Sequence, residues 1–326
     1  MRNSLFALVL LSTAAAAQTP PLPVAPPETV EVQVKPLTDE AVGNFVKTFT
    51  EPSLLSGKIP RWFKGICIKT EGVPTELAAA ITMRVLEVAR SAGAPVQEGA
   101  CATNTVVLFD SNPQAVLDDI AEYTPDLLGP HDPAEVKALA TVRFPVQAWY
   151  ATATRDNDGA VAIDVKEDQS GLCASVDLNV MRPDPDLKGG LKVDQVRLAS
   201  VISELERYCG RRAVTGSRLR DGVHSQMSTV TVVASLDTLK AHTPQALADY
   251  LALVILSQTK AFETCQQMES VANLLAPGCN PAKTVEGLTP GDTAFLKALY
   301  RADIGGTLVM QQASIRNEMK KLLNAK

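Results

Sequence analysis

The six cysteines are the residues whose type and spacing point most directly to a particular chemistry. No C-x-x-C pair occurs, and the wide spacings are not those of the common zinc sites. An even number of cysteines indicates disulfides when a chain works in an oxidising compartment. Fifteen pairings are formally possible, and closeness along the chain favours neighbours. The expected pairs are Cys67–Cys101, Cys173–Cys209 and Cys265–Cys279.

Three histidines are the only imidazole groups that acid–base or metal chemistry could use. His131 and His242 precede helix starts, His224 lies in a polar stretch, and none has a second metal ligand at helical spacing. We therefore predict no metal site and no cofactor. A Ser-His-Asp triad stays open, because its members can come from distant segments. The G-x-S-x-G turn that carries a serine nucleophile in α/β-hydrolases does not occur.

Carboxylates are the remaining candidates for catalysis. Two acids about 5–10 Å apart can hydrolyse a glycosidic bond, but 36 acidic residues give no basis for choosing a pair. Asp249 stands out because the surrounding segment, residues 246–256 (ALADYLALVIL), is otherwise almost entirely apolar. A helix that is apolar on all sides is buried. Asp249 is therefore either a hydrogen-bonded structural residue or the one candidate catalytic residue that we name.

The N-terminal segment predicts where the chain works. Residues 1–17 (MRNSLFALVLLSTAAAA) combine Arg2, an apolar run and small residues, as in a secretory signal peptide cleaved near Ala17-Gln18. The apolar run is shorter than the about 20 residues that span a bilayer. Residues 18–37 are rich in proline and are expected to form a disordered spacer. We therefore expect an exported, soluble protein that is periplasmic or extracellular.

The charge of the chain limits its partners. The formal net charge is −5, and no basic cluster of the kind that neutralises phosphates occurs. We therefore expect neither nucleic acid nor an anionic membrane surface as a partner. No later segment is long and apolar enough to be a transmembrane helix. The oligomeric state is not predicted.

Several helix starts share one signature, a Ser, Thr, Asp or Asn followed by proline. The first residue caps free backbone N–H groups, and proline fits the first helical position because its missing N–H would have no partner there. With apolar periodicity, this predicts helices over residues 75–92, 113–122, 133–140, 193–208, 244–260 and 290–300. Short β-branched runs predict strands over residues 66–70, 105–109, 145–154, 160–165, 175–180 and 230–234.

The order of these elements predicts the fold class. Residues 156–159 (DNDG) are typical of a hairpin turn and are expected to join the third and fourth predicted strands. Strands alternate with helices in the first part of the chain, and a predicted meander follows. This order predicts a single α+β (mixed α/β) domain over residues 38–326, with a mixed sheet and a central buried helix.

Four segments resemble known proteins when they are taken in order. They are RWFKGICIKTEG (61–72), CATNTVVLFD (101–110), TVTVVASLDTLKAHTPQALADYLALVILSQ (229–258) and LTPGDTAFLKALY (288–300). Together they resemble an uncharacterised family of secreted bacterial proteins and, more distantly, the zincin-like metallopeptidase scaffold. That scaffold opens with strand-helix-strand and continues with a central helix that carries H-E-x-x-H, the zinc-binding motif. The corresponding helix here contains no histidine, so the resemblance implies a relative without the metal site.

These observations favour one function and leave others open. We favour a non-enzymatic secreted protein whose zincin-like scaffold binds a protein or an envelope component. The alternative is a peptidase-like hydrolase that uses carboxylates or a dispersed triad. A third hypothesis is a module that binds a small molecule, which predicts a large apolar pocket with a few convergent polar groups.

Overall fold

The computed structural model describes residues 38–325 apart from residues 55, 129–130, 157–221, 260–264, 280–284 and 304. The described strands form one sheet of four, in the order β1-β2-β4-β3. They are β1 (Ile68–Glu71), β2 (Thr105–Asp110), β3 (Val146–Asp156) and β4 (Val223–Ser235). The first two strands and β4 are parallel, whereas β3 runs antiparallel to β4. The sheet is therefore mixed, as expected from the sequence.

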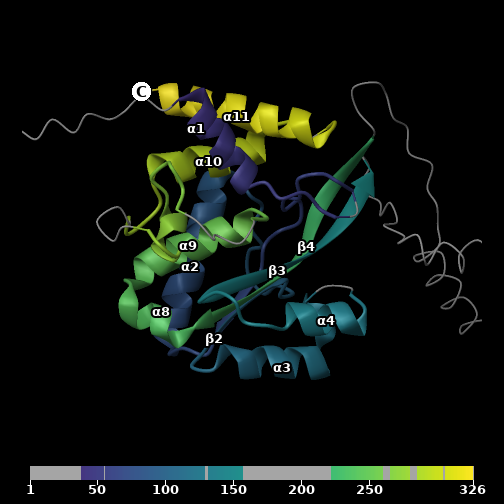
Figure 1. Ribbon diagram of the computed structural model, residues 1–326, viewed down its shortest axis with the longest axis vertical. Helices are drawn as coiled ribbons and strands as arrows, with labels where there is room; N and C mark the ends of the chain where they lie inside the picture. The colour runs from purple at the N-terminus through teal and green to yellow at the C-terminus, as the bar shows by residue number, and fades with distance from the viewer. Residues whose placement is uncertain are drawn as a thin grey trace, which may run out of the picture. The chain divides into compact units, whose positions relative to one another are not determined.

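Helices cover both faces of this sheet (Figure 1). On one face α2 (Thr75–Ala92) and α9 (Pro244–Leu256) pack against each other, with the short α8 (Leu236–Ala241) leading into α9. The layer beyond them contains α10 (Pro290–Arg301), α11 (Leu308–Asn324) and α1 (Asp39–Thr48). Alternate residues of β2, such as Val107 and Phe109, are buried in this larger core. The mixed α/β class is thus confirmed.

A smaller core lies on the other face of the sheet. It is covered by α3 (Pro113–Tyr123), the 3-10 helix η1 (Pro125–Leu128) and α4 (Pro133–Leu139). Trp149 of β3 and Val233 of β4 point into this core and pack with Leu117 and Leu128. Because neighbouring residues of a strand face opposite ways, burial on both faces explains why the inner strands read as continuous apolar runs.

The four helix starts predicted from a capping residue followed by proline are confirmed. The side chains of Asn112, Asp132, Thr243 and Thr289 each accept a hydrogen bond from a backbone N–H of the helix that follows. The N–H groups of Asp132 and Thr289 in turn donate to the acidic side chain three positions later, which completes a capping box at each helix start. These starts are local, so tertiary packing did not alter them.

Two predicted boundaries are wrong. The helix expected over residues 244–260 ends at Leu256, because Ser257 is extended and its hydroxyl donates to the Leu253 carbonyl at 2.7 Å. The chain then leaves the helix, and the Gln258 carbonyl accepts from the Glu51 N–H. Strand β4 begins at Val223, well before the expected residue 230, because its polar first half pairs with the second half of β3.

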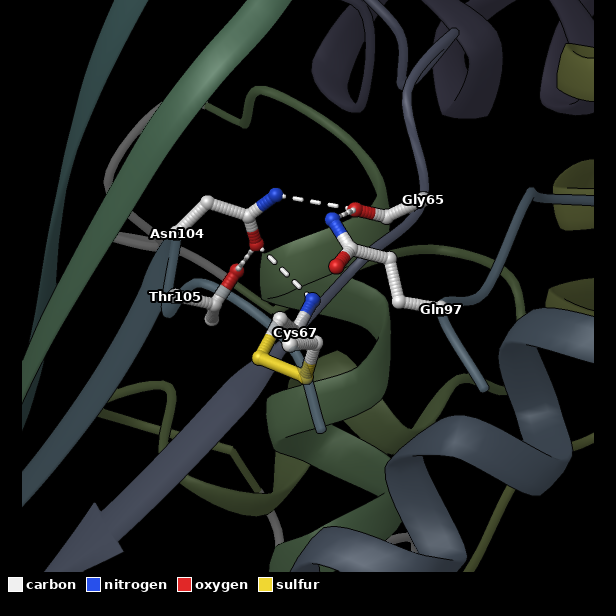
Figure 2. The surroundings of a disulfide bond; sticks show 6 residues. Gly65, Cys67, Gln97, Asn104 and Thr105 are labelled. Atoms are coloured by element: carbon white, nitrogen blue, oxygen red, sulfur yellow. Dashed lines mark hydrogen bonds between the residues drawn. A yellow bond between two sulfur atoms is a disulfide. The ribbon is translucent and has the colours of Figure 1, made fainter. Parts of the chain in front are cut away.

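Two of the three expected disulfides are confirmed, Cys67–Cys101 and Cys265–Cys279. Cys173 and Cys209 lie outside the described residues, as do the predicted strands over 160–165 and 175–180 and the predicted helix over 193–208. Figure 2 shows the surroundings of the first bridge: the Asn104 side chain accepts from the Cys67 N–H at 2.9 Å and donates to the Gly65 carbonyl at 2.9 Å. Asn104 thereby ties the start of β1 to the start of β2.

None of the helices in the described residues combines the length and the apolar character that a membrane crossing requires. The predicted signal peptide and spacer, residues 1–37, lie outside the described residues.

Candidate functional site

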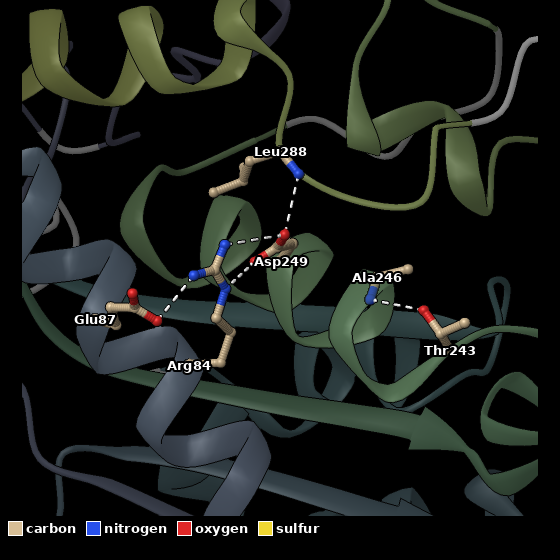
Figure 3. Close-up of polar contacts among 6 residues, drawn as sticks. All are labelled: Arg84, Glu87, Thr243, Ala246, Asp249 and Leu288. Carbon is tan, nitrogen blue, oxygen red and sulfur yellow. Dashed lines mark hydrogen bonds and ion pairs between the residues drawn. The ribbon is translucent and has the colours of Figure 1, made fainter.

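The buried helix α9 positions Asp249, the candidate named from the sequence. Every residue from Ala246 to Leu256 is buried, and the Asp249 side chain is only 3% exposed. Arg84 of α2 reaches this carboxylate with two nitrogens, Nε to Oδ1 at 2.6 Å and Nη2 to Oδ2 at 3.3 Å (Figure 3). The Leu288 N–H donates to Oδ2 at 3.0 Å. Both oxygens of Asp249 are therefore held by groups of the protein itself.

This arrangement joins three segments of the chain through one carboxylate. The hydrogen bond that Arg84 donates to Asp249 is the largest cause that raises the pKa of Arg84 above its ordinary value. A bidentate guanidinium–carboxylate contact is stronger than a single neutral hydrogen bond, and it also fixes the relative orientation of the two side chains. It clamps α9 to α2, and the Leu288 N–H adds the segment that leads into α10. We assign Asp249 a structural role on these contacts.

A second buried carboxylate, Asp292, also serves the architecture. It accepts from the Ser270 hydroxyl at 2.5 Å and from the backbone N–H groups of Val271 and Thr289, each at 2.9 Å. Burial is the main cause that raises its pKa, and these donors act in the opposite direction. Asp292 thus joins the start of α10 to η2 (Val271–Leu274).

Aromatic side chains from three different parts of the chain donate hydrogen bonds to the last backbone carbonyls of α9. Tyr150 hydroxyl donates to the Val254 carbonyl, Trp62 Nε1 to the Ile255 carbonyl, and Tyr300 hydroxyl to the Leu256 carbonyl, at 2.8–2.9 Å. The last carbonyls of a helix have no partner within the helix. Because this end is buried, side chains must supply the donors that water supplies elsewhere.

Tyr300→Phe tests this closure. Removing the hydroxyl leaves the buried Leu256 carbonyl without its side-chain donor, so we expect the free energy of unfolding to fall by about 1–3 kcal/mol. Urea unfolding followed by circular dichroism measures the change. Tyr123→Phe is the matched control, since Tyr123 is 71% exposed and its loss is expected to be close to zero. Equal effects of the two variants would contradict a capping role for Tyr300.

A groove lies beside Tyr150, between β3 and α9. Its volume is about 330 Å³, and every residue from Arg143 to Tyr150 lines it. Ala138 and Leu139 at the end of α4 form one wall, while Tyr250 and Val254 of α9 lie on another. Burial raises the pKa of Tyr150 to about 12, so its hydroxyl remains a hydrogen-bond donor over the physiological pH range.

The backbone of β3 presents outward-facing hydrogen-bonding groups to this groove. Strand β3 is at the end of the described sheet, so its outer edge has no partner strand among the described residues. The Ser235 N–H donates to the Pro145 carbonyl, which fixes the alternation of an antiparallel pair. The backbone groups of Val146, Ala148 and Tyr150 therefore point away from β4. Sequence reasoning missed this groove, because no single residue in it has a distinctive type.

The three histidines do not come together. His131 Nδ1 lies 3.2 Å from Glu135 at the start of α4, and His242 ends α8. His224 packs on the Phe63 ring, with 4.3 Å between ring centroids, and burial lowers its pKa. Within the described ranges, no three His, Cys, Asp or Glu side chains are grouped so that they could bind a metal ion.

The chain matches no known protein family, no curated protein and no solved structure. The described residues form a mixed α/β fold with two disulfides and a groove along the outermost described strand. The zincin-like resemblance stays a prediction from the sequence.

Proposed function

We propose that this chain is an exported, non-enzymatic protein that binds an extended segment of a partner protein in the groove along β3. The observation that carries the proposal is the row of outward backbone groups at Val146, Ala148 and Tyr150 on the wall of that groove. Donors and acceptors that alternate along an extended strand match another polypeptide backbone, which adds to the sheet as a further strand.

Three observations support the other parts of the proposal. The two disulfides fit the oxidising compartment that the predicted signal peptide implies. Helix α9, which corresponds to the metal-binding helix in the predicted zincin-like scaffold, contains no histidine, and its one acid is paired with Arg84. Binding therefore accounts for the groove without requiring a reactive group beside it.

Ala148→Pro tests the proposal directly. Proline removes the outward N–H of residue 148, while the pairing of β3 with β4 uses the neighbouring residues. We expect peptides selected from a displayed random library on the wild-type protein to bind this variant about tenfold more weakly, the loss of about one backbone hydrogen bond. Fluorescence anisotropy with a labelled selected peptide measures the affinity.

Two controls keep the result interpretable. Ala148→Ser retains the N–H and is expected to bind like the wild-type protein. Hydrogen exchange on the wild-type protein gives an independent readout, because the amides of Val146, Ala148 and Tyr150 should slow when the peptide is added. If the library yields no binder, or if the proline and serine variants bind alike without protection of these amides, the proposal is wrong.

A further inference from the structure

The described lining of the groove along β3 contains one positively charged side chain and no carboxylate. Among the described residues that line it, Arg143 is the only one with an ionisable carboxylate, ammonium or guanidinium group. Arg143 is exposed, and its guanidinium makes no ion pair or hydrogen bond within the described part of the chain. Other arginines, such as Arg84 and Arg61, are engaged by a carboxylate or by backbone carbonyls. Arg143 is thus a cation available to a ligand.

The backbone that carries Arg143 is held in place from both sides. Its N–H donates to Gln147 Oε1 at 2.9 Å, and Gln147 Nε2 donates to the Thr141 carbonyl at 3.1 Å. Gln114 of α3 fixes the preceding residues, because its side chain accepts from the Val142 N–H at 2.9 Å and donates to the Ala140 carbonyl at 2.7 Å. The turn is therefore ordered before any ligand arrives, which lowers the entropic cost of binding.

We infer that the groove selects extended segments that carry an acidic side chain at the end lying beside Arg143. This inference rests on the proposed function and specifies the class of partner. A carboxylate is the side-chain group that matches a guanidinium in charge and in fork geometry. The lining away from β3 is mainly apolar, with Leu139 of α4, Val254 of α9 and Leu275 at the end of η2, so apolar side chains are expected at the positions that follow the acid.

The test uses one peptide selected on the wild-type protein, made with an amidated C-terminus in two forms, one with Glu at the acidic position and one with Gln. We expect the Glu form to bind wild-type protein about two- to fivefold more tightly, the range that corresponds to a solvent-exposed ion pair. Arg143→Gln should remove this advantage, and Arg143→Glu should reverse it. Arg301→Gln, an exposed arginine away from the groove lining, should leave it unchanged.

The outcomes separate the two proposals. If both peptide forms bind wild-type protein alike, or if Arg143→Gln keeps the full preference for Glu, the acidic preference is wrong, while binding that is still lost in Ala148→Pro supports the edge-strand function. If binding requires a free C-terminal carboxylate instead of the acidic side chain, the inference is also overturned. If Ala148→Pro binds like Ala148→Ser and the amides of β3 gain no protection from exchange, the edge-strand function itself fails.

Discussion

Arg84→Met is expected to lower the free energy of unfolding by about 3–5 kcal/mol, the range measured when one partner of a buried ion pair is removed. Methionine keeps the length and apolar character of the stem but leaves the Asp249 carboxylate, 3% exposed, with the Leu288 N–H as its remaining described donor. An unpaired buried charge costs far more than the lost attraction alone. Urea unfolding at neutral pH measures the change.

Two companion variants identify the cause. Glu87→Gln removes the other acid that contacts Arg84, at 2.8 Å, but Glu87 is 67% exposed, so we expect a loss below about 1 kcal/mol. Adding Asp249→Asn to Arg84→Met removes the unpaired charge and keeps an acceptor for the Leu288 N–H, so it should recover part of the stability. A change within about 1 kcal/mol for Arg84→Met would refute the clamp between α2 and α9.

Replacing Cys67 and Cys101 together with alanine is expected to cost about 4 kcal/mol. The two cysteines are 34 positions apart in sequence. In the chain-entropy model, a cross-link that closes a loop of this size lowers the entropy of the unfolded chain and thereby stabilises the folded protein by about that amount. Cys67 is also 5% exposed and part of the buried set, so its loss removes packing as well. Thermal and urea unfolding of the double variant measure the effect.

The second disulfide provides the comparison. Cys265 and Cys279 are 14 positions apart, so their joint replacement is expected to cost about 3 kcal/mol, less than the first pair. The Asn104 side chain that binds the Cys67 N–H should keep the start of β1 in place after Cys67 is replaced. If removing the disulfide of the shorter loop lowers stability more than removing that of the longer loop, unfolded-chain entropy does not govern the contribution of these bridges.

Local signals carried much of the fold prediction. A capping residue followed by proline placed the starts of α3, α4, α9 and α10 correctly, because each cap satisfies backbone groups only a few residues away. The continuous apolar run at Thr105–Phe109 predicted an inner strand, and β2 is one. Helices α1 and α11 were missed, because their buried faces are narrow and depend on contact with each other and with α10.

Strand pairing was beyond the reach of these signals. The sequence predicted a hairpin after β3, but most of its turn and its second strand, residues 160–165, lie outside the described residues. The described partner of β3 is β4, which begins at Val223 and was not predicted as its neighbour. Pairing across such a separation depends on how both strands pack against helices on each face, and a local turn pattern contains no information about it. The groove has the same origin, since α4, β3 and α9 line it from separate parts of the chain.

The class of fold, the buried character of α9 and the two described cysteine pairs were predicted correctly from the sequence, because periodicity, capping and closeness along the chain are properties of neighbouring residues. The contacts of Asp249 became visible only in three dimensions, since its partner Arg84 is 165 positions away. The same holds for the donors that close α9, Trp62, Tyr150 and Tyr300. Such contacts exist because a buried polar group must find a partner in space, and distance along the chain does not limit which residue supplies it.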